Sequence, residues 1–69
     1  MLQRITRPTM VLAMNDNHHS AVPIEAGKVV DVVGSAEDDR FVIVTVDGER
    51  FLAFASDLGD RSTPAEANF

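Results

Sequence analysis

The chain has 69 residues, with 11 acidic side chains against 6 basic ones and a formal net charge of -5. A chain of this length makes one domain with a small core, and the absence of cysteine excludes a disulfide framework and a thiolate metal site. Without these supports, self-association is the remaining common source of extra stability. Excess negative charge disfavours contact with nucleic-acid backbones.

The first eight residues, 1–8, predict a flexible N-terminal arm. The segment contains Arg4 and ends in Arg7-Pro8, a pair that favours extended backbone over helix. It lacks the apolar core of a signal peptide, and no apolar run approaches the roughly 18 residues of a membrane span. We therefore expect a cytoplasmic protein with no membrane contact.

The domain is expected over residues 9–59, and it begins with TMVLAM at 9–14. This stretch predicts a strand, because it is too short for a stable helix. The polar cluster NDNHHS at 15–20 predicts a solvated loop. Asp16, His18 and His19 in this loop are weak candidates for metal ligands, but adjacent residues rarely converge on one ion, so no metal site is expected.

Two backbone signals precede the next strand. Pro23 lacks an N–H donor and should lie at an edge or a bend, while Gly27 permits a sharp entry into the strand. Branched side chains then predict a strand in KVVDVV at 28–33. The run SAEDD at 35–39 predicts an acidic loop.

The stretch from 40 to 56, RFVIVTVDGERFLAFAS, predicts a β-hairpin. Asp47-Gly48 readily takes the positive backbone angles that a two-residue turn requires. With these two residues as the loop, Val46 faces Glu49 and Val44 faces Phe51. A three-residue loop with a bulge is the alternative, and it would pair Val44 with Arg50.

Both faces of this hairpin are rich in apolar side chains. One face carries Val42, Val44, Val46, Phe51, Ala53 and Ala55, and the other carries Phe41, Ile43, Thr45, Arg50, Leu52 and Phe54. A sheet with one wet side should alternate apolar and polar residues, so something must cover the second face. The cover is either a partner or the chain's own residues 1–14.

The chain is expected to end its fold soon after the hairpin. Ser56 as a cap and Gly59 as a stop predict one helical turn near 56–59. The remaining residues, 60–69, are small and polar and predict a disordered C-terminal tail.

The predicted fold is all-β, a small antiparallel barrel of four to five strands. The order of these elements resembles that of an SH3-like barrel. A short first strand is followed by a long polar loop, an approach through Pro23 and Gly27, an acidic connector, a tight hairpin and a single helical turn. This resemblance implies a module for docking or assembly. Peptide-binding SH3 domains hold proline-rich segments with Tyr and Trp, and this chain has neither.

No motif in the chain indicates catalysis. Its serines lie outside any nucleophile elbow, and its glycines form no phosphate loop, so we expect no enzyme activity and no cofactor. The predicted function is a non-catalytic protein-interaction or assembly module, acting as a homo-oligomer without nucleic acid. Its predicted interface is the second hairpin face, with Phe41, Ile43, Arg50, Leu52 and Phe54. The alternative is a small-ligand or metal-binding regulator that uses the loop of Asp16, His18 and His19.

Overall fold

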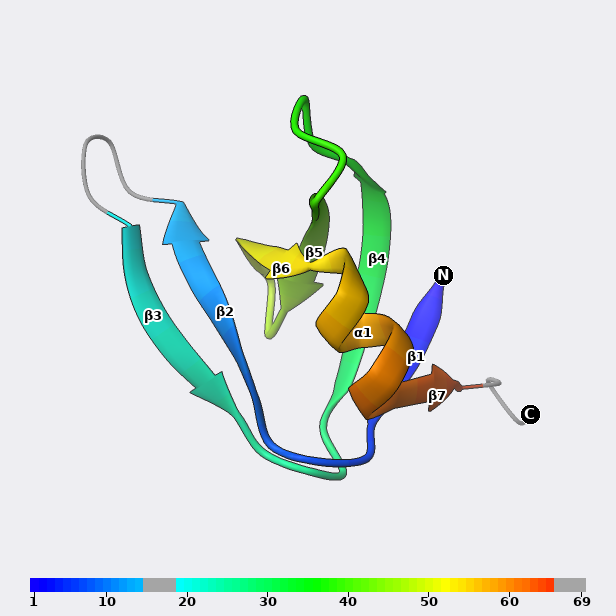
Figure 1. Ribbon diagram of the computed structural model, residues 1–69. Helices are drawn as coiled ribbons and strands as arrows, with labels where there is room; N and C mark the ends of the chain where they lie inside the picture. Colours follow the sequence, from blue (N-terminus) through cyan, green and yellow to red (C-terminus); the bar gives the residue numbers. More distant parts are fainter. Residues whose placement is uncertain (15–18, 66–69) are drawn as a thin grey trace.

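The computed structural model describes residues 1–14 and 19–65. Within these residues the chain forms one antiparallel sheet and one short helix (Figure 1). The elements in chain order are β1 (Leu2–Ile5), β2 (Thr9–Met14), β3 (His19–Ile24), β4 (Val29–Ser35), β5 (Phe41–Val46), β6 (Glu49–Phe54), α1 (Ala55–Arg61) and β7 (Ser62–Pro64).

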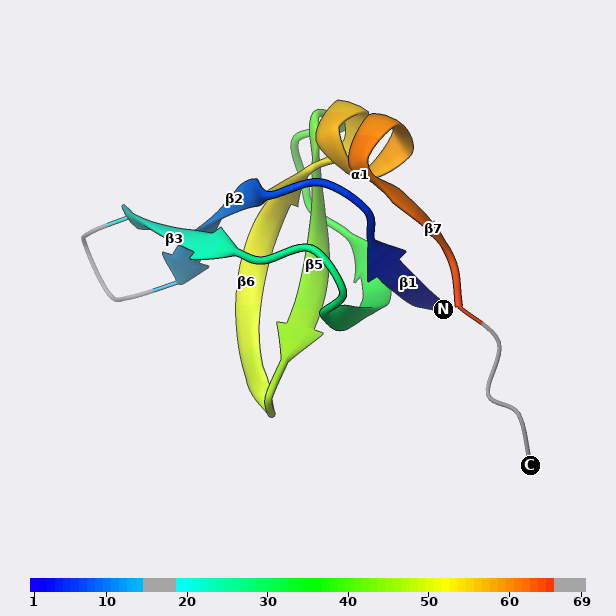
Figure 2. The ribbon, with the colours of Figure 1, turned by 90° about the horizontal axis from the view of Figure 1, so that it is seen from below.

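The sheet has seven strands in the order β3-β2-β6-β5-β4-β1-β7. It curls around a core in the manner of a small barrel, as Figure 2 shows, but β3 and β7 do not pair with each other, so the barrel is not closed. The all-β, barrel-like prediction is therefore confirmed, with more strands than the four to five expected. None of the helical structure in the described residues is long and apolar enough to cross a membrane.

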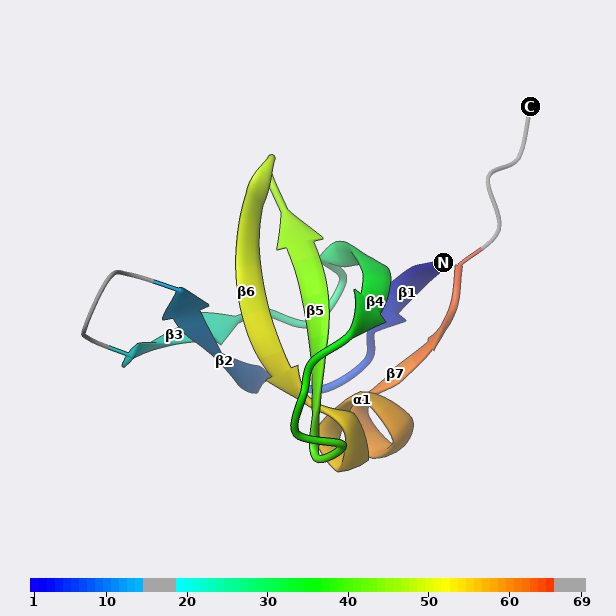
Figure 3. The same ribbon diagram turned by 90° about the horizontal axis from the view of Figure 1, so that it is seen from above.

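The β5–β6 hairpin has the register predicted for a two-residue loop. Val46 pairs with Glu49 and Val44 with Phe51. The turn residues Asp47 and Gly48 have φ angles of 52° and 84°, so both take the left-handed backbone that this turn requires. The bulged alternative is excluded. Figure 3 shows the two strands side by side at the centre of the sheet.

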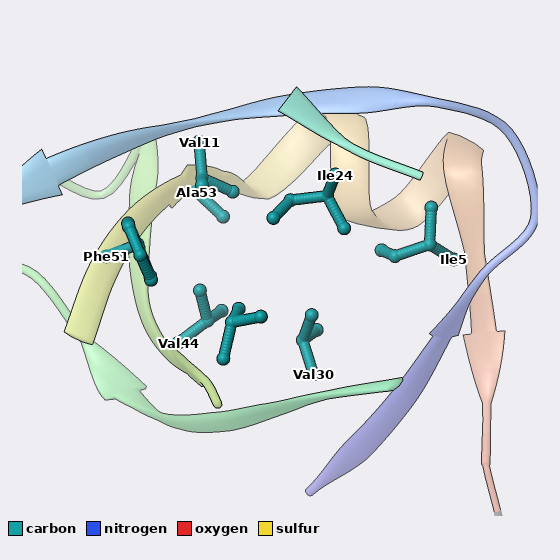
Figure 4. Packing of buried hydrophobic residues seen from close by; sticks show 8 residues of the cluster. Ile5, Val11, Ile24, Val30, Val44, Phe51 and Ala53 are labelled. Atoms are coloured by element: carbon teal, nitrogen blue, oxygen red, sulfur yellow. The ribbon is translucent and has the colours of Figure 1, made fainter. Parts of the chain in front are cut away.

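The core lies inside the curl of the sheet and draws on six strands. The buried hydrophobic residues are Ile5, Val11, Ile24, Val30, Val44, Val46, Phe51 and Ala53 (Figure 4). Most are branched aliphatic residues, which pack well on a pleated surface. The hairpin supplies Val44, Val46, Phe51 and Ala53, so the face that begins at Val42 is the inner face of the barrel.

The N-terminal segment is not the flexible arm that we expected. Residues 2–5 form β1, which pairs with β4 on one side and β7 on the other. Alternate residues Gln3 and Ile5 are buried, and the Ile5 amide donates to the carbonyl oxygen of Lys28 at 2.8 Å. Arg7 and Pro8 follow this strand and end it, so those signals marked a boundary and not an arm.

The C-terminal prediction is wrong in part. The helix extends over Ala55–Arg61, beyond the single turn expected at 56–59, and Ser62–Pro64 form β7 on β1. The Ser62 hydroxyl lies within hydrogen-bond distance of the Gln3 side chain and of the carbonyl oxygen of Leu58, and these contacts fix the junction. Residues 60–65 of the expected disordered tail are therefore ordered, and 66–69 lie outside the described residues.

Strand β3 was also missed, because His19 and Ser20 looked like loop and Pro23 interrupts the stretch. The strand pairs with β2 along its whole length, from Thr9 opposite Ile24 to Met14 opposite His19. It lies at the edge of the sheet, which is where Pro is tolerated and where Pro23 was expected. Gly27 makes the predicted sharp entry into β4, with φ of 95°.

Candidate interaction surface

The candidate site is the outer face of the sheet, the side of β2, β5 and β6 that points away from the core. Alternation along the strands sends the predicted interface residues to this side, opposite the buried Val44 and Phe51. We call this surface the outer face. It is formed by Met10, Leu12, Phe41, Ile43, Leu52 and Phe54.

The strand register brings these side chains into two adjacent rows. Ile43 lies opposite Leu52, which in turn lies opposite Leu12 of β2. In the next row Phe41 lies opposite Phe54, and the continuing register places Met10 beside Phe54. Cross-strand neighbours of this kind are within contact distance, so the rows form one continuous apolar surface.

The aromatic pair marks one end of the outer face. The ring centroids of Phe41 and Phe54 are 4.8 Å apart with an interplanar angle of 42°. This tilted arrangement is favourable for aromatic pairs. The guanidinium of Arg40 lies over the Phe41 ring, 5.9 Å from its centroid. The pair is therefore held in place within the chain.

The outer face is only partly covered by the chain itself. Phe54 retains 36% of its exposure and Met10 retains 43%, whereas Val44 on the inner face retains 0%. Phe41, Ile43, Leu52 and Leu12 are half-buried. Strand β1 pairs at the far side of β4, so the N-terminal segment does not fold over this surface. Exposed apolar groups in a contiguous patch are typical of interaction sites.

A polar row borders the outer face near the hairpin turn. Asp31 of β4 lies opposite Thr45, and Thr45 lies opposite Arg50. Arg50 is exposed and forms no ion pair with any residue that the structure describes. Asp31 accepts from the amino group of Met1 at 2.8 Å. One margin of the patch therefore carries charges of both signs.

The other end of the outer face carries an ion pair in the loop before β5. Arg40 Nη2 lies 2.6 Å from Asp38 Oδ2, and the Arg40 amide also donates to Asp38 Oδ1. These hydrogen bonds from Arg40 lower the pKa of Asp38 from 3.8 to about 2 and raise the pKa of Arg40. The acidic run at 37–39 is thus partly neutralised by its neighbour.

Sequence reasoning found the hairpin's share of this surface but missed the share of β2. Leu12 and Met10 alternate with the buried Val11, so they had to lie on the side away from the core. This alternation is visible in the sequence TMVLAM, but only the order of strands in the sheet places β2 beside β6. Sequence reasoning also missed a bulge in β4 between Val32 and Gly34. Val33 lies at this bulge and is 50% exposed.

The weak metal candidates do not form a described site. Asp16 and His18 lie outside the described residues, and His19 begins β3 with a side chain that is also outside them. Among the residues that are described, no three His, Asp or Glu side chains gather closely enough to hold a metal ion.

A separate hollow of about 350 Å³ lies beneath α1. Its walls are mostly apolar, with Val32, Val42 and Leu58 among them, and the polar side chains of Gln3 and Ser62 bond to each other at 3.1 Å. The walls include no acidic, basic or imidazole side chain. The hollow therefore offers mainly apolar contact.

Comparison with known proteins gives no relative, since no family model, no curated protein and no solved structure matches the chain significantly.

Proposed function

We propose that this protein is a non-catalytic assembly module of the cytoplasm, which self-associates through the outer face of its sheet. The observation that supports this function is the continuous apolar surface across β2, β6 and β5, with Phe54 and Met10 left 36% and 43% exposed. Soluble domains keep such patches small unless a partner covers them. A small domain also gains stability from association that its own core cannot supply.

The charges at the margin favour a second copy as the partner. Arg50 and Asp31 lie in the same row across the sheet, at the same border of the patch. Two-fold symmetry presents the same surface to itself, so Arg50 of each copy can approach Asp31 or Glu49 of the other. A surface with both signs of charge is complementary to itself. Rim pairs of this kind set orientation more than affinity.

The resemblance to SH3-like barrels is part of the same proposal. It rests on the order of strands, the connector and the hairpin, and it implies docking or assembly as the general role. A proline-groove function is not proposed, because the chain has no Tyr and no Trp.

The test is the variant Phe54→Asp, measured by light scattering. A carboxylate buried without a partner in an apolar interface costs several kcal/mol, so association should weaken by more than about tenfold. Thr63→Asp is the matched control, because it adds the same charge at an exposed position of β7 outside the outer face. Circular dichroism checks that both variants fold. Equal association of Phe54→Asp and wild type would reject the proposed interface.

A further inference from the structure

Strand β3 leaves one edge of the sheet open. It is the first strand in the sheet order and pairs only with β2 among the described strands (Figure 1). An open edge presents unpaired backbone N–H and C=O groups to any chain that can add a strand. Natural edges are usually blocked by charges or prolines. Residues 19–24, HSAVPI, hold no acidic residue, lysine or arginine, and Pro23 removes one N–H donor from this edge.

The position of Pro23 indicates which backbone groups of β3 point toward the open edge. In an antiparallel pair, opposed residues alternate between pairs that exchange two hydrogen bonds and pairs that exchange none. Pro23 lies opposite Met10 and has no N–H, so this pair belongs to the second kind. By alternation Ala21, opposite Leu12, does not bond to β2 either. Both the N–H and the C=O of Ala21 therefore face the open edge, together with the C=O of Pro23.

The hairpin supports the same parity independently. The residues that flank its two-residue turn, Val46 and Glu49, exchange hydrogen bonds with each other. The backbone groups of Leu52 then point away from β5 and bond to Leu12 of β2. Leu12 therefore has no backbone group left for β3, which again leaves Ala21 free at the edge.

A groove runs beside this edge. It has a volume of about 470 Å³ and lies between the C-terminal part of β3 and the tip of the β5–β6 hairpin. Its apolar walls come from the inner-facing side chains of Val22 and Ile24 and from Val46 and Phe51 of the hairpin. A strand added to β3 would direct every second side chain into this groove.

The rim of the groove is acidic. Lys28 and Asp47 neutralise each other, with Lys28 Nζ 2.8 Å from Asp47 Oδ2. Glu25 and Glu49 also line the groove, and neither forms an ion pair with any other described residue. The rim thus carries an uncompensated negative charge, which a lysine or arginine of a partner complements.

We propose that the free edge of β3 binds an extended segment of a partner protein as an additional antiparallel strand, with alternate apolar side chains in the groove and a basic residue beside Glu25 and Glu49. Main-chain hydrogen bonds to Ala21 hold the segment, and the groove selects its side chains. A second copy of this chain suits the edge less well. It would bring the net charge of -5 of another chain to an acidic rim, and pairing β3 with its own copy would place two prolines without N–H donors in the new ladder instead of one.

The probe is a fluorescent peptide of sequence KTVTV, followed by anisotropy. Its lysine and valines share the side of the strand that faces the groove, and the antiparallel direction puts the lysine at the Glu25 end. The backbone groups of its threonines then point toward the open edge, where Ala21 and the carbonyl oxygen of Pro23 lie. N-methylation of the threonine amides should weaken binding by more than about tenfold, since it removes the bonding N–H groups. N-methylation of the same number of valine amides should leave binding nearly unchanged. The peptide ETVTV should bind more weakly than KTVTV, because its first residue repels Glu25 and Glu49.

Protein variants test the same edge. Ala21→Pro removes the outward N–H without removing a bond to β2, and should abolish binding, whereas Ala21→Val keeps this N–H and should bind as wild type does. Circular dichroism shows whether both variants fold. Phe54→Asp should bind the peptide normally, which separates this site from the proposed oligomer interface.

Three results would overturn the inference. The first is no anisotropy change with KTVTV at millimolar protein. The second is equal binding of the two methylated peptides, which would place the contact elsewhere. The third is a loss of oligomer mass in Ala21→Pro without any peptide, which would make the edge an interface between copies of this chain.

Discussion

The two faces of the β5–β6 hairpin have similar side chains but different surroundings. The inner face places Val44 and Phe51 at 0% and 8% exposure, while Phe54 on the outer face keeps 36%. The difference comes from neighbours: β1, β2, β3 and β4 each send a buried side chain toward the inner face. On the outer face, the large apolar neighbours that the register of the described strands places beside the hairpin are Leu12 and Met10 of β2. Hydrophobicity alone therefore does not decide which face is the core.

The largest difference between the two faces is expected when the same charge is placed on either side of one strand. Val44→Asp puts a carboxylate into the core, at a cost of several kcal/mol, which is comparable to the whole stability of a small domain. This variant should be unfolded. Ile43→Asp, one residue earlier, should remain folded and lose association. Circular dichroism and light scattering read the two effects, and unfolding of both variants would mean that the two faces are equally part of the core.

The second change removes strand β7. Deleting residues 62–69 takes away the strand that pairs with β1 and the hydrogen bond from the Ser62 hydroxyl to Gln3. Because β1 brings Ile5 to the inner face, the core should loosen while the outer face stays intact. We expect the melting temperature to fall by more than about 5 °C, roughly 1 kcal/mol for so small a domain. An unchanged melting temperature would show that β1 needs no neighbour beyond β4.

These elements also show what the sequence could and could not predict. The hairpin was predictable because Asp47-Gly48 and the alternation around it are local signals. Strands β1 and β7 were not, since Gln3 pairs with Pro64 across almost the whole chain. Strands of four and three residues are also too short to show a periodic pattern in the sequence.

The candidate surface, too, was predictable where it depends on local signals and not where it depends on long-range pairing. The register predicted from the turn placed Phe41, Ile43, Leu52 and Phe54 on one face, and the structure has that register. Which face became the core depended on the curl of the whole sheet. The share of β2 in the outer face depended on the strand order, which residues 9–14 alone do not encode.

The third change tests the turn that assigns each side chain to a face. Gly48 has φ of 84°, and nothing lies within 4 Å of where a side chain would begin, so the cost of Gly48→Val is one of backbone strain and not of crowding. The variant should lose about 1 kcal/mol or more of stability. Chemical denaturation measures the change. A midpoint equal to that of wild type would mean that the turn tolerates another backbone shape.

The smallest effect concerns the ion pair beside the outer face. Because the pKa of Asp38 lies at about 2 in the folded chain, below its ordinary 3.8, the ionised carboxyl favours folding above about pH 4. This contribution is lost as the pH falls through about 2. Asp38→Asn should therefore be slightly less stable than wild type near neutral pH and equal to it in strong acid. A carboxyl titration by NMR that places Asp38 near 3.8 would show that the pair does not form in solution.

Self-association through the outer face is tested most directly by sedimentation equilibrium of the unmodified protein over a range of concentrations. One chain has a mass of 7.5 kDa. If the outer face binds a second copy, the apparent mass should rise with concentration toward twice that value. A mass that remains at 7.5 kDa up to the highest attainable concentration would contradict self-association through this face.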